Sequence, residues 1–127
     1  MTVDDLLDAA RSALVRLQPH AAVEAVRAGA VLVDIRSDAQ RAADGLVPGT
    51  IRIARNVLEW RCDPQSRWRD PAVSEPGLHV LLLCHEGYQS SLAAATLQRL
   101  GLPRATDVIG GMEAWRAAGL PVLAAAV

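Results

Sequence analysis

One residue of this sequence, Cys84, stands where a thiol is best placed for nucleophilic chemistry. The apolar run Val80–Leu83 predicts a buried strand that ends at the cysteine, and a short loop containing Gly87 leads into a helical segment that stops near Gly101. Backbone N–H groups and the positive end of the helix dipole converge at such a junction, where they favour a thiolate. The sequence therefore predicts that Cys84 is a nucleophile.

The loop that follows this cysteine is predicted to form the binding site. Gly87 permits backbone conformations that other residues avoid, and Ser90 and Ser91 can cap the helix that begins there. The amides of residues 85–90 can then point inward and form a concave ring that suits an anionic group on the sulfur, such as a persulfide or a sulfur oxyanion. Tyr88 supplies a hydroxyl at the rim. The candidate binding residues of the loop are His85, Glu86, Gly87, Tyr88, Gln89 and Ser90.

Length and composition limit the range of functions. The 127 residues suit one domain, 1–127, and the formal net charge of −1 without a run of like charge argues against a nucleic-acid partner. No apolar run is long enough to cross a bilayer, so no membrane partner is expected. All 13 basic residues are arginine, which excludes mechanisms that need a lysine and leaves arginine or backbone amides to bind anions.

The two cysteines indicate a reducing compartment. The amino terminus is acidic where a secretory leader would be basic, so we expect a cytoplasmic location and two free thiols. Cys62 lacks the strand and helix that flank Cys84, and we expect it to be a buried structural residue. His20 and His79 are expected at the surface. No cysteine or histidine pair has zinc-site spacing, so no metal is expected.

The remaining pattern predicts an α/β fold. Apolar residues at helical spacing predict a helix within residues 6–17, and a second helix over 20–28 stops at Gly29. Residues 30–35 and 80–84 read as buried strands, 51–53 and 106–109 as weaker ones, and 61–79 as an irregular surface connection. Strands alternating with helices imply a mostly parallel sheet with helices on both faces.

Ligands of such sheets bind beyond the carboxyl ends of the strands, and the sequence brings three polar side chains to that edge. These residues are Asp34, Arg36 and Cys84. Asp34 and Arg36 are predicted to form a pair that supports the turn after the first strand, rather than to take part in the chemistry.

Four ordered motifs resemble those of rhodanese-type sulfurtransferase domains. They are Val33-Asp-Ile-Arg36, Gly45-Leu-Val-Pro-Gly-Thr50, Cys84-x-x-Gly-x-Gln-Ser90 and Gly110-Gly-x-x-x-Trp-x-x-x-Gly-x-Pro121. The resemblance covers roughly residues 14–122, which implies a core domain preceded by a helical extension, residues 1–13. It also implies a five-stranded, mostly parallel sheet with flanking helices, and neither a metal nor an organic cofactor.

The resemblance implies a reaction in two steps. The Cys84 thiolate attacks the outer sulfur of a donor such as thiosulfate, sulfite leaves, and a persulfide remains on the protein. An acceptor nucleophile then takes this sulfur. Cyanide is the usual acceptor in assays of the family, and a cellular thiol or a partner protein is the expected natural one.

The loop departs from the family pattern in its charge. Many members carry an arginine or lysine inside the loop, whereas His85, Glu86 and Gln89 stand here, and Leu46 replaces the usual histidine of the second motif. Thiosulfate is a dianion, so we expect poor turnover with it and a preference for a protein persulfide or a less charged donor. Arg41 and Arg55 are the candidates for supplying a cation from outside the loop.

Two alternatives keep the same fold. In one, the domain is a sulfur-relay or binding module that accepts a persulfide only from a protein partner. In the other, it acts on arsenate or phosphate. The related phosphatases and arsenate reductases use a longer loop that ends in an arginine, whereas Ser90 stands at that place and Glu86 would repel a phosphate.

Overall fold

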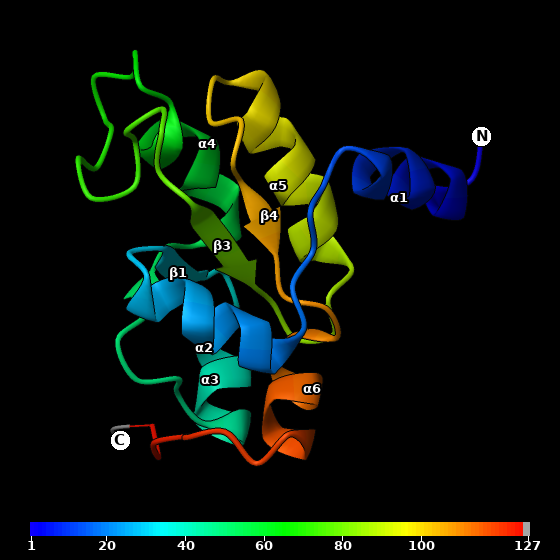
Figure 1. Cartoon of the computed structure of the whole chain (residues 1–127), viewed down its shortest axis with the longest axis vertical. Coiled ribbons are helices and arrows are strands. Elements are labelled where there is room, and N and C mark those ends of the chain that lie inside the picture. The colour runs from blue at the N-terminus through cyan, green and yellow to red at the C-terminus, as the bar shows by residue number, and fades with distance from the viewer. Residues whose placement is uncertain (126–127) are drawn as a thin grey trace.

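The computed structural model describes residues 1–125, which form an α/β fold with a parallel sheet between two layers of helices (Figure 1). The four strands of the described residues are β1 (Val31–Asp34), β2 (Ile51–Arg52), β3 (Val80–Leu83) and β4 (Thr106–Asp107). They lie in the order β2-β1-β3-β4, and every pair is parallel. The predicted fold class and parallel sheet are confirmed.

The predicted count of five strands is wrong for residues 1–125. At the β4 edge, Leu17 forms only a single parallel bridge with Val108. Its N–H donates to the Asp107 carbonyl at 3.1 Å, and its carbonyl accepts from the Ile109 N–H at 2.8 Å. Pro19 follows two residues later and begins a helix, and because proline has no N–H the pairing does not extend.

Alternate residues of β3 divide the core into two halves. Val80 and Leu82 pack with α4 (Leu58–Cys62) and α5 (Gln89–Arg99) on one face. Leu81 and Leu83 pack with α2 (Pro19–Arg27) and α6 (Gly111–Ala117) on the other. This arrangement is the period-2 alternation of a strand that is buried on both sides.

Three further helices complete the described fold. Helix α1 (Val3–Ser12) begins with a capping box between Thr2 and Asp5, packs on α5 and buries only Leu7. Helix α3 (Asp38–Asp44) follows β1, and the short helix η1 (Arg55–Val57) precedes α4. The connection predicted over 61–79 is irregular from Asp63 to His79, whereas Arg61 and Cys62 belong to α4. Among the described residues, no helix has both the length and the apolar character needed to span a membrane.

The topology places a crevice where the site was predicted. Strand β1 has β2 on one side and β3 on the other, so the loops after β1 and β3 diverge at the carboxyl edge of the sheet. Asp34 is paired in register with Leu83, the residue before Cys84. The turn into α3 and the cysteine loop therefore lie side by side.

Candidate active site

Cys84 directly follows β3, with its sulfur at a cavity on the carboxyl edge of the sheet. The residue is only 4% exposed, yet it lines a cavity of about 250 Å³. Its Sγ accepts a hydrogen bond from the Gly87 N–H at 3.1 Å and donates one to Ser90 Oγ at 3.2 Å. The other lining residues are Gln40, His85, Glu86, Tyr88 and Gln89. A small reactant can thus reach a thiol that is otherwise enclosed.

Two glycines allow the loop to pack closely against the start of α6. Gly87 has φ +85°, and a Cβ on it would lie 2.7 Å from the Gly110 nitrogen. A Cβ on Gly111, whose φ is +57°, would lie 2.5 Å from the Cys84 carbonyl oxygen. The first amides of α6 bind the loop from behind, since the Met112 N–H donates to the Cys84 carbonyl at 2.8 Å and the Glu113 N–H to the His85 carbonyl at 3.1 Å.

The two serines after the loop do not cap α5, contrary to the expectation. The N-cap is Tyr88, which makes no side-chain capping bond. Instead, the Ser90 and Ser91 hydroxyls donate to Asp107 Oδ2 at 2.7 and 2.8 Å. Because Ser90 gives its only hydrogen to this carboxylate, its oxygen is left to accept the hydrogen of the Cys84 thiol.

Asp107, at the end of β4, was missed by the sequence analysis. Its fully buried carboxylate is paired with Arg16, whose Nε lies 2.8 Å from Oδ1 and whose Nη2 lies 3.2 Å from Oδ2. Arg16 was missed as well. These two residues are 91 positions apart, and no local motif joins them.

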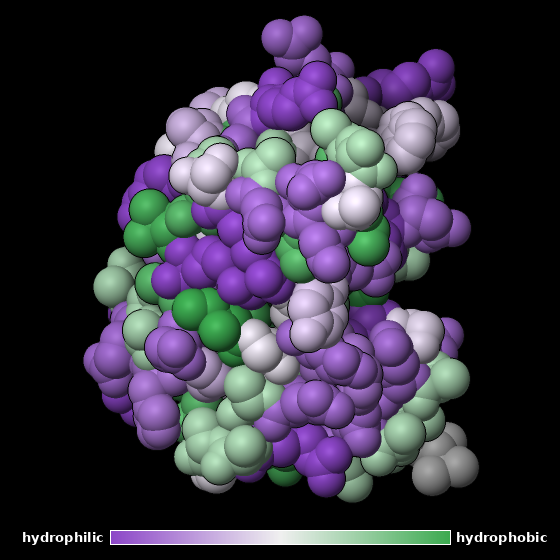
Figure 2. Space-filling view, turned by 90° about the vertical axis from the view of Figure 1, so that its right-hand side faces the viewer, coloured by the Kyte–Doolittle hydropathy of each residue, from purple (hydrophilic) through white to green (hydrophobic). Residues whose placement is uncertain are grey.

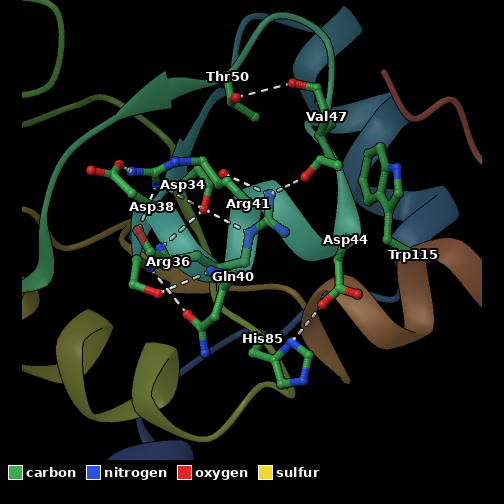
Figure 3. Close-up of polar contacts among 12 residues, drawn as sticks. Asp34, Arg36, Asp38, Gln40, Arg41, Asp44, Val47, Thr50, His85 and Trp115 are labelled. Atoms are coloured by element: carbon green, nitrogen blue, oxygen red, sulfur yellow. Dashed lines mark hydrogen bonds and ion pairs between the residues drawn. The ribbon is translucent and has the colours of Figure 1, made fainter. Parts of the chain in front are cut away.

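The rim of the cavity is acidic. His85 Nδ1 lies 3.4 Å from the Asp44 carboxylate (Figure 3), and its Nε2 lies 3.8 Å from Glu86 and 3.7 Å from Glu113. His85, Glu86 and Glu113 are also the only group of metal-ligand side chains found in residues 1–125, with ligand atoms within 4.8 Å of one another. Exposed acidic groups commonly approach one another in this way without an ion, and we assign no metal to them.

Asp34 and Arg36 form a buried pair behind the rim (Figure 3). Arg36 Nε and Nη2 donate to the two carboxylate oxygens of Asp34 at 3.0 and 2.9 Å, and both side chains are fully buried. Arg36 Nη2 also donates to the Gly45 carbonyl at 2.8 Å. The pair thus ties the end of β1 to the end of α3, which contributes Gln40 to the cavity.

The two arginines predicted to supply a cation from outside the loop differ in their positions relative to the cysteine cavity. Arg41 donates to the Arg36 carbonyl at 2.6 Å and to Asp38 at 2.7 Å (Figure 3), and it is not among the residues that line the cysteine cavity. Arg55 pairs with Glu59 at 2.8 Å and lines a neighbouring hollow of about 380 Å³. That hollow shares Gln40 and Gln89 with the cysteine cavity.

The second cysteine lies away from this cavity, in α4. Cys62 is fully buried, and burial together with the Asp70 and Glu59 carboxylates raises its thiol pKa to about 12. It therefore stays protonated at neutral pH, which suits a structural residue. His20 is exposed, whereas His79 is half-buried, and burial and the nearby Arg104 lower the pKa of His79.

Comparisons with known proteins agree with this geometry. The family model for the rhodanese-like domain matches residues 18–118. A sulfurtransferase from Allochromatium vinosum is 31% identical over 94 residues, which cover 74% of this chain and 78% of that protein.

Solved structures extend the similarity to nearly the whole chain. One is a protein of unknown function from Rhodopseudomonas palustris CGA009, described as a possible tyrosine phosphatase, with 34% identity, a TM-score of 0.87 and coverage of 96% of this chain and 94% of that one. Another is the homodimeric polysulfide-sulfur transferase from Wolinella succinogenes, with 26% identity, a TM-score of 0.71 and coverage of 92% and 83%. With a family model that spans most of its length and a sulfurtransferase relative, the chain belongs to the rhodanese-like domain family.

Proposed function

We propose that this protein is a sulfurtransferase that carries a sulfane sulfur on Cys84. The observation that carries the proposal is the position of the thiol, which lines the cavity while the Gly87 N–H donates to its sulfur at 3.1 Å. An N–H in this position stabilises a thiolate before the reaction and again when the persulfide is discharged. The sulfurtransferase relative and the polysulfide-sulfur transferase neighbour support the same chemistry.

The transfer takes place in two displacements. The Cys84 thiolate attacks the outer sulfur of thiosulfate or a similar donor, the donor's S–S bond breaks, and sulfite leaves with the bonding electron pair. A thiol or cyanide then attacks the terminal sulfur, and the Cys84 thiolate leaves. Both steps balance without an added oxidant, reductant or cofactor. Because the chemistry requires a free thiol, we infer a cytoplasmic location.

Several side chains are assigned to substrate binding by their place around the cavity. The residues that line it are Gln40, His85, Glu86, Tyr88 and Gln89. The Ser90 hydroxyl contacts the Cys84 sulfur. Arg55 is the candidate outside cation nearer to this cavity, because its own hollow adjoins the cavity through Gln40 and Gln89. Arg41 supports the turn into α3 through its bond to the Arg36 carbonyl.

The acidic rim favours a donor other than free thiosulfate. Asp44, Glu86 and Glu113 surround His85, and the described residues that line the cavity include no arginine. A dianion entering this cavity meets negative charge without a compensating cation. A protein persulfide or a less charged donor fits better, which keeps the alternative of a sulfur-relay module that is loaded only by a protein partner.

Phosphatase activity is the competing function raised by the Rhodopseudomonas neighbour. A phosphate dianion is normally held by a bidentate arginine, whereas the described lining of this cavity contains no arginine and includes Glu86. Ser90, at the end of the loop, is buried and bonded to Asp107. We therefore expect no hydrolysis of a generic aryl phosphate.

Mass spectrometry after exposure to a donor panel tests the proposal. Thiosulfate, a polysulfide and a persulfide-loaded desulfurase should be compared for addition of a sulfur atom to the peptide that contains Cys84. The wild type and Cys62→Ala should gain the sulfur, and Cys84→Ala should not. Thiocyanate formation from thiosulfate and cyanide supports a stand-alone enzyme, whereas loading by the desulfurase alone supports the relay. An unchanged mass with every donor would refute both.

A further inference from the structure

The segment that precedes the family-matched region reaches the cysteine loop. The match begins at residue 18, and both Arg11, at the end of α1, and Arg16 lie before it. Backbone bonds between Leu17 and the end of β4 fix the register of this segment against the sheet. Its contacts with the loop are therefore built into the fold, although they lie outside the residues that the family model matches.

Both arginines bind the same carbonyl. Arg11 Nη2 donates to the Gly87 carbonyl oxygen at 2.7 Å, and Arg16 Nη2 donates to it at 3.1 Å. The N–H of the same Gly87 donates to Cys84 Sγ. A glycine has the softest backbone of any residue, so fixing its carbonyl restricts how far its N–H can turn away from the sulfur.

Arg16 connects this carbonyl to the other contact of the sulfur. Its guanidinium is bidentate on Asp107, and Asp107 holds the Ser90 hydroxyl that lies 3.2 Å from Sγ. The Arg16 guanidinium therefore helps to position both groups that contact the thiol, the Gly87 N–H and the Ser90 hydroxyl. Bidentate geometry also fixes its orientation, which a single ammonium group would not do.

Arg11 links the loop to α1, a helix whose residues are mostly exposed. Its Nε donates to Ser91 Oγ at 3.1 Å, and its guanidinium carbon lies 5.6 Å from the centre of the Tyr88 ring. Helix α1 buries only Leu7 and leaves an apolar groove of about 590 Å³ against α5. Figure 2 views the molecule from the side on which α1 lies in Figure 1, where apolar residues are visible among hydrophilic ones. The polar contacts of Arg11 are thus a main tie between α1 and the loop.

We propose that Arg11 and Arg16 are positioning residues, which hold Gly87 so that its N–H stays on the Cys84 sulfur. The segment before the family-matched region is then a functional part of the site. The proposal rests on the proposed function only in that Cys84 is the reactive residue.

Two measurements that require no sulfur transfer test this role. One is hydrogen exchange of the Gly87 amide by NMR, and the other is the rate of Cys84 alkylation by iodoacetamide, separated from Cys62 by peptide mass spectrometry. The variants are Arg11→Ala, Arg11→Lys and Arg16→Ala. The matched control is Arg27→Ala, because Arg27 is largely exposed and pairs only with Glu24 on α2.

Loss of either guanidinium should speed Gly87 exchange about tenfold, the effect of one hydrogen bond to a charged group, and should slow alkylation at neutral pH. Arg11→Lys should restore part of the wild-type exchange and alkylation rates, since an ammonium can still donate to the Gly87 carbonyl but lacks the fixed planar geometry of the guanidinium. Arg27→Ala should match the wild type. Unchanged exchange and alkylation in Arg11→Ala and Arg16→Ala, at wild-type circular dichroism, would overturn the proposal.

The design separates the two proposals and guards against misfolding. Arg16→Ala leaves a buried carboxylate without its cation, whereas Arg11→Ala leaves no buried charge unpaired, so Arg11→Ala is decisive if Arg16→Ala fails to fold. If the wild type takes up no sulfur while Gly87 exchange still responds to Arg11, the proposed function fails and the positioning role stands. If the wild type takes up sulfur normally but Gly87 exchange does not change in Arg11→Ala, the proposed function stands and the positioning role fails.

Discussion

The Asp107 carboxylate is fully buried and accepts hydrogen bonds from two serine hydroxyls and a guanidinium. We predict that Asp107→Asn lowers the free energy of unfolding by about 3 kcal/mol, because it leaves the Arg16 charge without its partner. Urea denaturation measures the loss. Glu24→Gln is the matched control, since its pair with Arg27 lies at the surface and should change stability by less than about 0.5 kcal/mol. Equal effects of the two substitutions would contradict a central role for Asp107.

Cys62 makes stability depend on alkaline pH. Its pKa is raised from the ordinary 9.0 to about 12 in the folded protein, so the folded state keeps this proton where the unfolded state loses it. The stabilisation is complete below about pH 9 and is lost as the pH rises towards 12, at about 1.4 kcal/mol per unit. Unfolding curves over this range should fall more steeply for the wild type than for Cys62→Ala. Parallel curves would show that Cys62 ionises freely.

Single residues also differ in how readily the sequence reveals them. The position of Cys84 between a strand and a helix could be predicted because its signal is local, namely an apolar strand, a glycine and a helix within a short stretch. Asp107 and Arg16 could not, because their contact joins positions 91 apart and depends on where the chain before α2 meets β4. Arg41 and Arg55 could be named as candidates, but the direction of a long flexible side chain depends on which carboxylate or carbonyl it meets.

At the scale of elements, the close approach of α6 to the cysteine loop depends on Gly111. We predict that Gly111→Ala destabilises the protein by about 2 kcal/mol more than Gly49→Ala, because its Cβ would lie 2.5 Å from the Cys84 carbonyl oxygen and must displace the loop. Gly49 has a positive φ of +77° as well, but nothing lies within 4 Å of its Cβ, so it reports backbone strain alone. Urea midpoints give the comparison. A loss of stability no larger than that of Gly49→Ala would mean that the loop can move aside at no cost.

The elements themselves were predictable where their pattern is strong. The runs at 30–35 and 80–84 gave the two central strands because both faces of these strands are buried, which requires continuous apolar sequence. The edge strands β2 and β4 have only two residues each, too few for a periodic signal. No fifth strand forms beside β4 in the described residues, because the pairing at Leu17 ends where Pro19 starts α2.

At the scale of the whole molecule, negative charge gathers at the cavity mouth although the net charge is only −1. We predict that Cys84 reacts faster with neutral iodoacetamide than with anionic iodoacetate, beyond the ratio for a free thiol, and that added salt narrows the gap. The double variant Glu86→Gln/Glu113→Gln should reduce this preference by about threefold at low salt. Arg27→Ala, far from the rim charges in sequence, provides the control. If the preference for iodoacetamide changes neither with salt nor with the two substitutions, charge repulsion at the rim is not its cause.

A practical consequence concerns how this protein is cut for expression. Trimming the gene to the boundaries of the family match would remove Arg11 and Arg16, which bind the Gly87 carbonyl oxygen. It would also leave the Asp107 carboxylate without its counterion. Such a fragment would retain the motif around Cys84 while losing the side chains that support the cysteine loop. Recombinant versions should therefore begin at or before Thr2, which caps the first helix.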